Sequence, residues 1–369
     1  MFACVYVVAD VLVAQAAKRS WDLWDVQNIE RNYRTPNELY HHDLVPLSDT
    51  VGIWGQSIYR IRTNSMGFKD SSTRQVAIHS DRYRILMIGD SFTEGVGLEF
   101  EKTFAGIAFA QFAQRGIEVL NAGVIGYSPS IYYRKIKYLL ESVDLKIDEV
   151  VVFLDISDIA DDAHLYQIDE NDRVVQRPEF PDWGSGWTGG QISDDDQFAN
   201  RIKHFLKTNS ITIRLMDELK DRLLAPPAGQ NPPPILLGGP RGEWTSERYF
   251  EQHGRPGLEI TRQNMDRLVS LLSRHSVRLT VVVYPWPAQV YYGDLNSIQV
   301  AYWQDWAAQN QLTLVNLFPP FFVDQQRDNV LRDYYFPGDV HFNEAGNRLI
   351  AENFLRLFIP ANADTGQAQ

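Results

Sequence analysis

The stretch RILMIGDSFTEG, residues 84–95, decides the fold. It begins with an apolar run of the length expected for a buried strand, and Gly89 and Asp90 end that run. Small residues on both sides of Ser91 allow a sharp turn and let backbone N–H groups approach a bound oxygen. Asp and Ser are also common helix caps, so this stretch alone is compatible with a purely structural role.

Strands and helices alternate along the rest of the chain. The predicted strands are 84–90, 118–123, 149–157, 277–287 and 312–321, and the predicted helices are 104–116, 128–143, 257–276, 297–311 and 344–358. Such alternation is typical of βαβ units in a parallel sheet that is covered on both faces. We therefore predict an α/β fold with a mainly parallel central sheet.

The alternation predicts one domain over residues 80–360 with an insertion at about 160–255. The insertion contains acidic and proline-rich stretches and one amphipathic helix, which suits a surface flap or linker. Residues 20–79 are rich in Trp, Tyr, Asn and His and have no helical period, so we expect an extended leader that wraps the domain. Residues 361–369 form a short tail.

The first 19 residues differ in composition from the rest of the chain. They are almost wholly apolar up to Lys18, with Asp10 as the one earlier charge. A bilayer span needs about 20 apolar residues, and a secretory signal begins with positive charge. A membrane anchor that begins before residue 1, an unusual signal peptide and an ordinary amphipathic helix all stay open. We favour the anchor and an extracytoplasmic location over a cytoplasmic one.

Composition excludes several classes of function. The chain has 35 basic and 47 acidic side chains and no basic stripe, so nucleic acid is not an expected partner. Cys4 is the only cysteine, which excludes internal disulfides and thiolate metal clusters. The chain contains neither a phosphate-binding glycine pattern nor a His-x-x-x-His helix, so we expect no metal and no cofactor.

A serine nucleophile requires a histidine that is held by a carboxylate. His341 lies in PGDVHFNEAG, residues 337–346, between the last strand and the last helix, which places it at the same sheet edge as Ser91. Asp339, two residues earlier, can accept the proton on Nδ1. His164 follows two aspartates after the third strand and is the alternative. We prefer His341, because a mobile acidic insertion holds fixed geometry less well.

The GDSFTEG stretch together with the late Asp/His pair resembles the GDSL or SGNH hydrolases, a family of esterases and acyltransferases. The similarity covers residues 84–158 and 277–358. It implies a flavodoxin-like three-layer α/β/α fold, with Ser91 as nucleophile and as oxyanion donor through its backbone N–H. It also implies that Gly126, in the segment NAGVIG, is a second backbone donor to the oxyanion.

Two motifs depart from the family pattern. Where the family usually has Gly-x-Asn-Asp, this chain reads DISD at 155–158, so Ser157 stands in place of the oxyanion-binding asparagine. A hydroxyl is shorter than an amide, and the loss of one such donor costs on the order of 10²- to 10³-fold in turnover. The last motif is Asp-x-His rather than Asp-x-x-His, which is similar to the branch that includes alginate O-acetylation proteins.

This resemblance implies a serine ester hydrolase or O-acyltransferase that acts through an acyl-enzyme, with an acetyl ester of a carbohydrate as the favoured substrate. The alternatives are an inactive relative that binds glycan or protein, and a lipase or thioesterase. Aromatic residues around the fourth strand either stack on a sugar or pack in the core; they are Tyr284, Trp286, Tyr291 and Tyr292.

Overall fold

The computed structural model describes residues 10, 29–55, 57–177, 239–324 and 326–360. The chain divides into two units, and the unit formed by residues 32–177 and 234–369 holds everything described below. The predicted N-terminal anchor, the amphipathic helix of the insertion and the C-terminal tail lie outside the described residues. No helix of the described ranges is long and apolar enough to cross a membrane.

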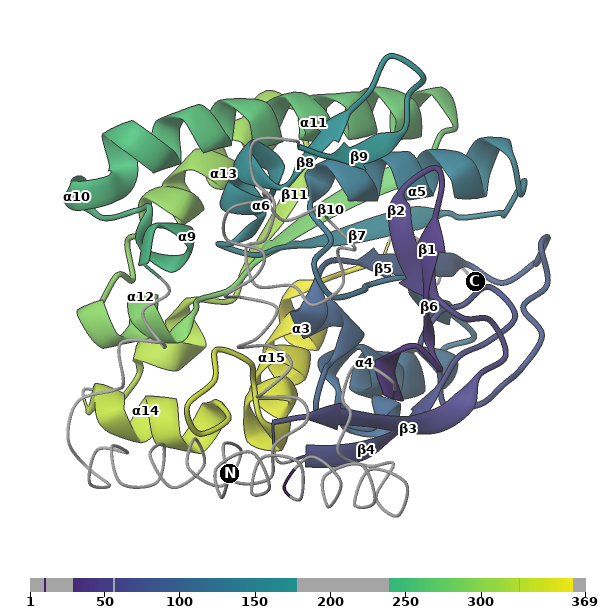
Figure 1. Ribbon diagram of the computed structural model, residues 1–369, viewed down its shortest axis with the longest axis horizontal. Helices are drawn as coiled ribbons and strands as arrows, with labels where there is room; N and C mark the ends of the chain where they lie inside the picture. The colour runs from purple at the N-terminus through teal and green to yellow at the C-terminus, as the bar shows by residue number, and fades with distance from the viewer. Residues whose placement is uncertain (1–9, 11–28, 56, 178–238, 325, 361–369) are drawn as a thin grey trace, which may run out of the picture. The chain divides into compact units, whose positions relative to one another are not determined.

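A five-stranded parallel sheet forms the centre of this unit. Its order is β11-β10-β7-β5-β6 (Figure 1). The strands are β5 (Arg84–Ile88), β6 (Glu118–Asn121), β7 (Glu149–Leu154), β10 (Arg278–Val283) and β11 (Thr313–Asn316). Leu86 of β5 pairs with Leu120 on one side and with Val150 on the other. The predicted parallel sheet is therefore confirmed.

Helices cover both faces of the sheet (Figure 1). One layer contains α5 (Pro129–Glu141), α11 (Arg255–Arg274) and α13 (Ile298–Gln309), and the opposite layer contains α4 (Phe104–Ala113) and α15 (Glu344–Leu357). All five begin and end within three residues of their predicted bounds. The fold is therefore a three-layer α/β/α sandwich, as predicted.

Shorter elements connect these layers. They are α3 (Ser91–Glu94), η2 (Phe100–Lys102), α6 (Asp158–His164), β8 (Tyr166–Ile168), β9 (Val174–Gln176), α9 (Gly239–Glu243), α10 (Glu247–Tyr249), η4 (Phe250–Gly254), α12 (Pro287–Tyr292), η5 (Pro319–Phe322) and α14 (Arg327–Tyr334). The described ends of the predicted insertion thus contain two-stranded and helical segments.

The core lies between the sheet and the helices. Every residue of β7 is buried, which explains its almost continuous apolar sequence. Phe153 of this strand packs against Phe104 of α4 and Phe354 of α15, with ring centroids 4.6 and 5.5 Å apart. Burial of each such ring contributes roughly 1.5–3 kcal/mol to the free energy of unfolding.

The leader forms two antiparallel hairpins. Strand β1 (Arg34–Asn37) pairs with β2 (His41–Leu44), and β3 (Asp49–Trp54) pairs with β4 (Ser57–Arg62). The buried Lys69 Nζ then donates to the carbonyl oxygens of Gly95 and Leu98, at 2.7 Å each. These bonds attach the leader to the segment that follows Ser91.

Candidate active site

Ser91 lies where the central strand β5 gives way to the short helix α3. Asp90 caps this helix by accepting a hydrogen bond from the Phe92 N–H at 2.9 Å. A Cβ atom at Gly89 would lie 2.1 Å from the Thr93 hydroxyl oxygen, so this tight turn requires glycine. Strands β6 and β7 flank β5 on opposite sides, so the connections from β5 to β6 and from β6 to β7 run in opposite directions across the sheet. Ser91 lies at this switch point, where a ligand crevice is expected in a parallel sheet.

His341 and Asp339 reach Ser91 from the loop between α14 and α15. The Phe336 N–H donates to the His341 carbonyl at 2.9 Å, which closes this loop on itself. His341 Nε2 lies 2.7 Å from Ser91 Oγ, and His341 Nδ1 lies 2.6 Å from Asp339 Oδ1. Because the carboxylate can only accept, Nδ1 carries the proton and Nε2 accepts from the serine hydroxyl. The structure thus brings the three predicted side chains together in one chain of hydrogen bonds.

Aromatic rings enclose the imidazole. The Phe92 ring lies 4.7 Å from it, and the Trp54 ring lies edge-on at 4.9 Å. The Trp54 indole N–H also donates to Asp339 Oδ2 at 2.6 Å. Burial would raise the pKa of Asp339, but hydrogen bonds from His341 and Trp54 outweigh it and lower this pKa below its ordinary value. Asp339 is therefore ionised at neutral pH.

The segment with Gly126 is held from two sides. Its neighbour Ile125 donates its N–H to Glu94 Oε2 at 2.7 Å, and the Ile125 carbonyl lies 2.7 Å from His42 Nε2. Gly126 itself has a φ of +73°, which favours glycine. Within the described part of the chain, no hydrogen bond of the fold uses the N–H groups of Ser91 and Gly126.

Glu94 in turn forms a buried ion pair with Arg34 of the leader. Two hydrogen bonds of 2.7 Å join the guanidinium to the carboxylate, and the side chains are 1% and 0% exposed. Burial lowers the pKa of Arg34, but the charge of Glu94, its hydrogen bonds and the nearby Tyr33 and Tyr59 together outweigh burial and raise this pKa above its ordinary value. The leader thus helps to fix the segment that contains Gly126.

The third motif is fully buried. Ser157 directly precedes α6, its backbone N–H donates to Asp155 Oδ1 at 2.5 Å, and its buried hydroxyl lies beside the same carboxylate. Asp158 accepts from the Asp155 N–H and from the Tyr132 hydroxyl, both at 2.9 Å. Asp155 accepts from the Trp286 indole N–H. Both carboxylates are therefore held by donors inside the fold.

Three carboxylates lie together near the nucleophile: Asp90, Asp155 and Asp158. Burial raises the pKa of all three, and mutual repulsion raises the pKa of Asp90 and Asp158 further. The fold therefore disfavours the ionised form of each of these carboxyl groups relative to water.

The other predicted residues have different surroundings. His164 packs against His253, with ring centroids 6.2 Å apart, whereas the contact with Ser91 is made by His341. Tyr284 and Trp286 are buried, so these two rings pack in the core and do not form an exposed platform. Tyr292 is 56% exposed. The described residues contain no group of three or more His, Cys, Asp or Glu that could hold a metal ion.

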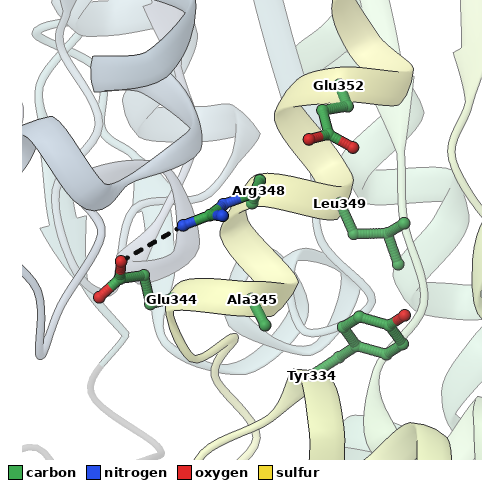
Figure 2. A pocket seen from close by; sticks show the side chains of 6 residues that line it. All are labelled: Tyr334, Glu344, Ala345, Arg348, Leu349 and Glu352. Carbon is green, nitrogen blue, oxygen red and sulfur yellow. Dashed lines mark hydrogen bonds and ion pairs between the residues drawn. The ribbon is translucent and has the colours of Figure 1, made fainter.

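A hollow of about 420 Å³ lies along α15 (Figure 2). Its lining residues are Tyr334 of α14 and Glu344, Ala345, Arg348, Leu349 and Glu352 of α15, and Glu344 forms an ion pair with Arg348. None of the residues predicted to act on a substrate lines it. This hollow is therefore separate from the candidate active site.

The three-layer fold with a serine, a histidine and an aspartate in hydrogen-bond contact defines the class of SGNH-type hydrolases. The chain belongs to the GDSL-like Lipase/Acylhydrolase family, whose model matches residues 87–349. The members of this family act on ester bonds. No curated protein matches the chain.

Several solved structures are similar to this chain. A lipolytic protein of the G-D-S-L family from Veillonella parvula is 13% identical, with a TM-score of 0.40, over 75% of this chain and 98% of its own. Esterase EstA from Pseudoalteromonas is 14% identical, with a TM-score of 0.39, over 74% and 95%. A mutant of Axe2, an acetyl-xylooligosaccharide esterase from Geobacillus, is 13% identical, with a TM-score of 0.36, over 76% and 96%. These values are too low to support an inference about substrate.

Sequence reasoning missed four residues that organise the site: Arg34, His42, Trp54 and Glu94. Glu94 offered a signal, because a charged residue inside a run of small and buried residues needs a partner. The other three lie in the leader, where no local pattern connects them to Ser91 or Asp339.

Proposed function

We propose that this chain is a serine esterase or O-acyltransferase that works through an acyl-enzyme on Ser91. The observation that carries the proposal is the hydrogen-bond chain from Asp339 through His341 to Ser91, with distances of 2.6 and 2.7 Å. His341 takes the hydroxyl proton as Ser91 Oγ attacks the ester carbonyl, and Asp339 stabilises the imidazolium that forms. His341 then gives this proton to the departing alcohol.

The negative oxygen of the tetrahedral intermediate requires donors. The N–H groups of Ser91 and Gly126 are the two proposed donors, and the buried hydroxyl of Ser157, which lies beside Asp155, is the candidate for a third. Because the Gly126 segment is fixed by Glu94 and His42, its donor is in place before the substrate binds. Donors that need no reorganisation stabilise the transition state more than the ground state.

The favoured substrate is an acetyl ester of a carbohydrate. The Asp-x-His motif supports it, because this motif is similar to the branch that acts on sugar acetyl esters. Burial of the site also favours a small acyl group, since Ser91 and His341 are only 7% and 8% exposed. Water or a sugar hydroxyl then accepts the acyl group, and the acceptor decides between hydrolase and transferase.

Attachment to a membrane through the first 19 residues stays a prediction, which fractionation of cells expressing the full chain tests.

The decisive experiment compares wild type with Ser91→Ala. Wild type should hydrolyse p-nitrophenyl acetate faster than the decanoate and should release acetate from acetylated xylo-oligosaccharides. Ser91→Ala should lose these activities by at least about 10³-fold. Ser270→Ala removes an exposed hydroxyl from α11 and is the matched control. Equal rates for wild type and Ser91→Ala would instead indicate a binding module.

A further inference from the structure

We propose that Trp54 is a positioning residue for Asp339, so that the β3–β4 hairpin of the leader is a working part of the active site. This inference rests on the proposed function. It adds a requirement that the family motifs do not contain, namely a donor from outside the three-layer domain that fixes the carboxylate of the triad.

The two oxygens of Asp339 have separate partners. Oδ1 accepts from the backbone N–H of His341 at 3.0 Å and lies 2.6 Å from its Nδ1. Oδ2 accepts from the Trp54 indole at 2.6 Å. The Asp339 side chain is 25% exposed. Without Trp54, water would replace this donor, and rotation of the carboxyl group, which has broad torsional preferences, would be less restricted.

Trp54 is itself held in place. It is the last residue of β3 and pairs with Ser57 across the hairpin turn, where Gly55 has a φ of +55°. A Cβ atom at Gly97 would lie 3.4 Å from Trp54 Cδ1, so the indole packs over the segment that follows Ser91. The Trp54 ring also contacts the His341 imidazole edge-on. One side chain thus touches both the base and the carboxylate that orients it.

A purely structural role for Trp54 makes a different prediction. If the Trp54 ring only fills space, Trp54→Phe should preserve activity. Phenylalanine keeps a six-membered aromatic ring and lacks only the five-membered ring that carries the N–H donor. If the N–H fixes Asp339, this variant should lower kcat by about 10- to 100-fold, as expected for a lost hydrogen bond to a charged group. KM should stay within about twofold, because Trp54 acts through Asp339 and His341 and not on the bound substrate.

The test measures kcat and KM on p-nitrophenyl acetate for Trp54→Phe, Asp339→Ala and the double variant. Trp54→Phe should have no further effect in the Asp339→Ala background, because both oxygens of the carboxylate that it orients are gone. Ile58→Ala, on the same hairpin and 62% exposed in the wild type, is the matched control and should keep wild-type kinetics. Full activity of Trp54→Phe, or equal losses in both backgrounds, overturns the proposal.

A second measurement does not change residue 54, so it tests the proposal even if Trp54→Phe folds poorly. In Asp339→Ala, which removes the acceptor of the Trp54 indole, one tryptophan indole N–H should shift or exchange faster in NMR spectra, and unchanged indole signals would overturn the proposal. Ser91→Ala separates the two hypotheses. If Ser91→Ala is inactive and Trp54→Phe is fully active, only the role of Trp54 fails. If Ser91→Ala is fully active, the proposed function fails as well.

Discussion

Removing the charge of Glu94 should destabilise both the fold and the site. In Glu94→Gln, one carboxylate oxygen becomes an amide NH₂ group that faces a donor of Arg34, and the buried guanidinium loses its counter-charge. The pair is almost wholly buried, with side chains 1% and 0% exposed. Loss of one partner of a buried ion pair costs about 3–5 kcal/mol in the free energy of unfolding. We expect a loss in this range.

Urea unfolding checks this magnitude, and p-nitrophenyl acetate hydrolysis checks the effect on the site. Asp49→Asn is the control, because its pair with Arg60 is exposed and screened by solvent and should change the free energy of unfolding far less. The double variant Arg34→Met/Glu94→Gln should regain part of the stability, since no buried charge is left unpaired. A loss below about 1 kcal/mol in Glu94→Gln would refute the reasoning.

Three further predictions concern the same site. Asp339→Asn should lower kcat on the order of 10³- to 10⁴-fold in steady-state assays, because the amide donates to Nδ1 and imposes the wrong tautomer. Ser157→Ala should lower kcat about 10-fold or more without changing KM if its hydroxyl donates to the oxyanion; an unchanged kcat would contradict that role. Burial, then repulsion from nearby carboxylates, raises the pKa of Asp158 in the folded protein. Its contribution to stability is therefore complete below about pH 4 and is lost as the pH rises through the folded pKa. Asp158→Asn should raise the melting temperature near pH 8 and change it little at pH 4; equal effects at both values would contradict the sign.

Local patterns predicted the parts of the fold that depend on local physics. The apolar runs at 84–90 and 149–157 predicted buried strands because a parallel sheet covered on both faces excludes polar side chains. PGDVHFNEAG predicted a loop before a helix, and the structure shows the Asn343 side chain capping α15. The predicted approach of His341 to Ser91 followed from a topological rule, since loops after parallel strands meet at one edge of the sheet.

The leader shows what only the tertiary structure decided. Trp54 and Asp339 lie 285 positions apart, and Arg34 and Glu94 lie 60 apart. No periodicity or spacing encodes such pairs, because each depends on how a hairpin outside the α/β repeat packs against the domain. The sequence by itself determined the sheet, the helices and the three side chains at its edge. The packing of the leader decided which groups hold those side chains in place, because a hydrogen bond forms only when folding brings donor and acceptor within about 3 Å of each other.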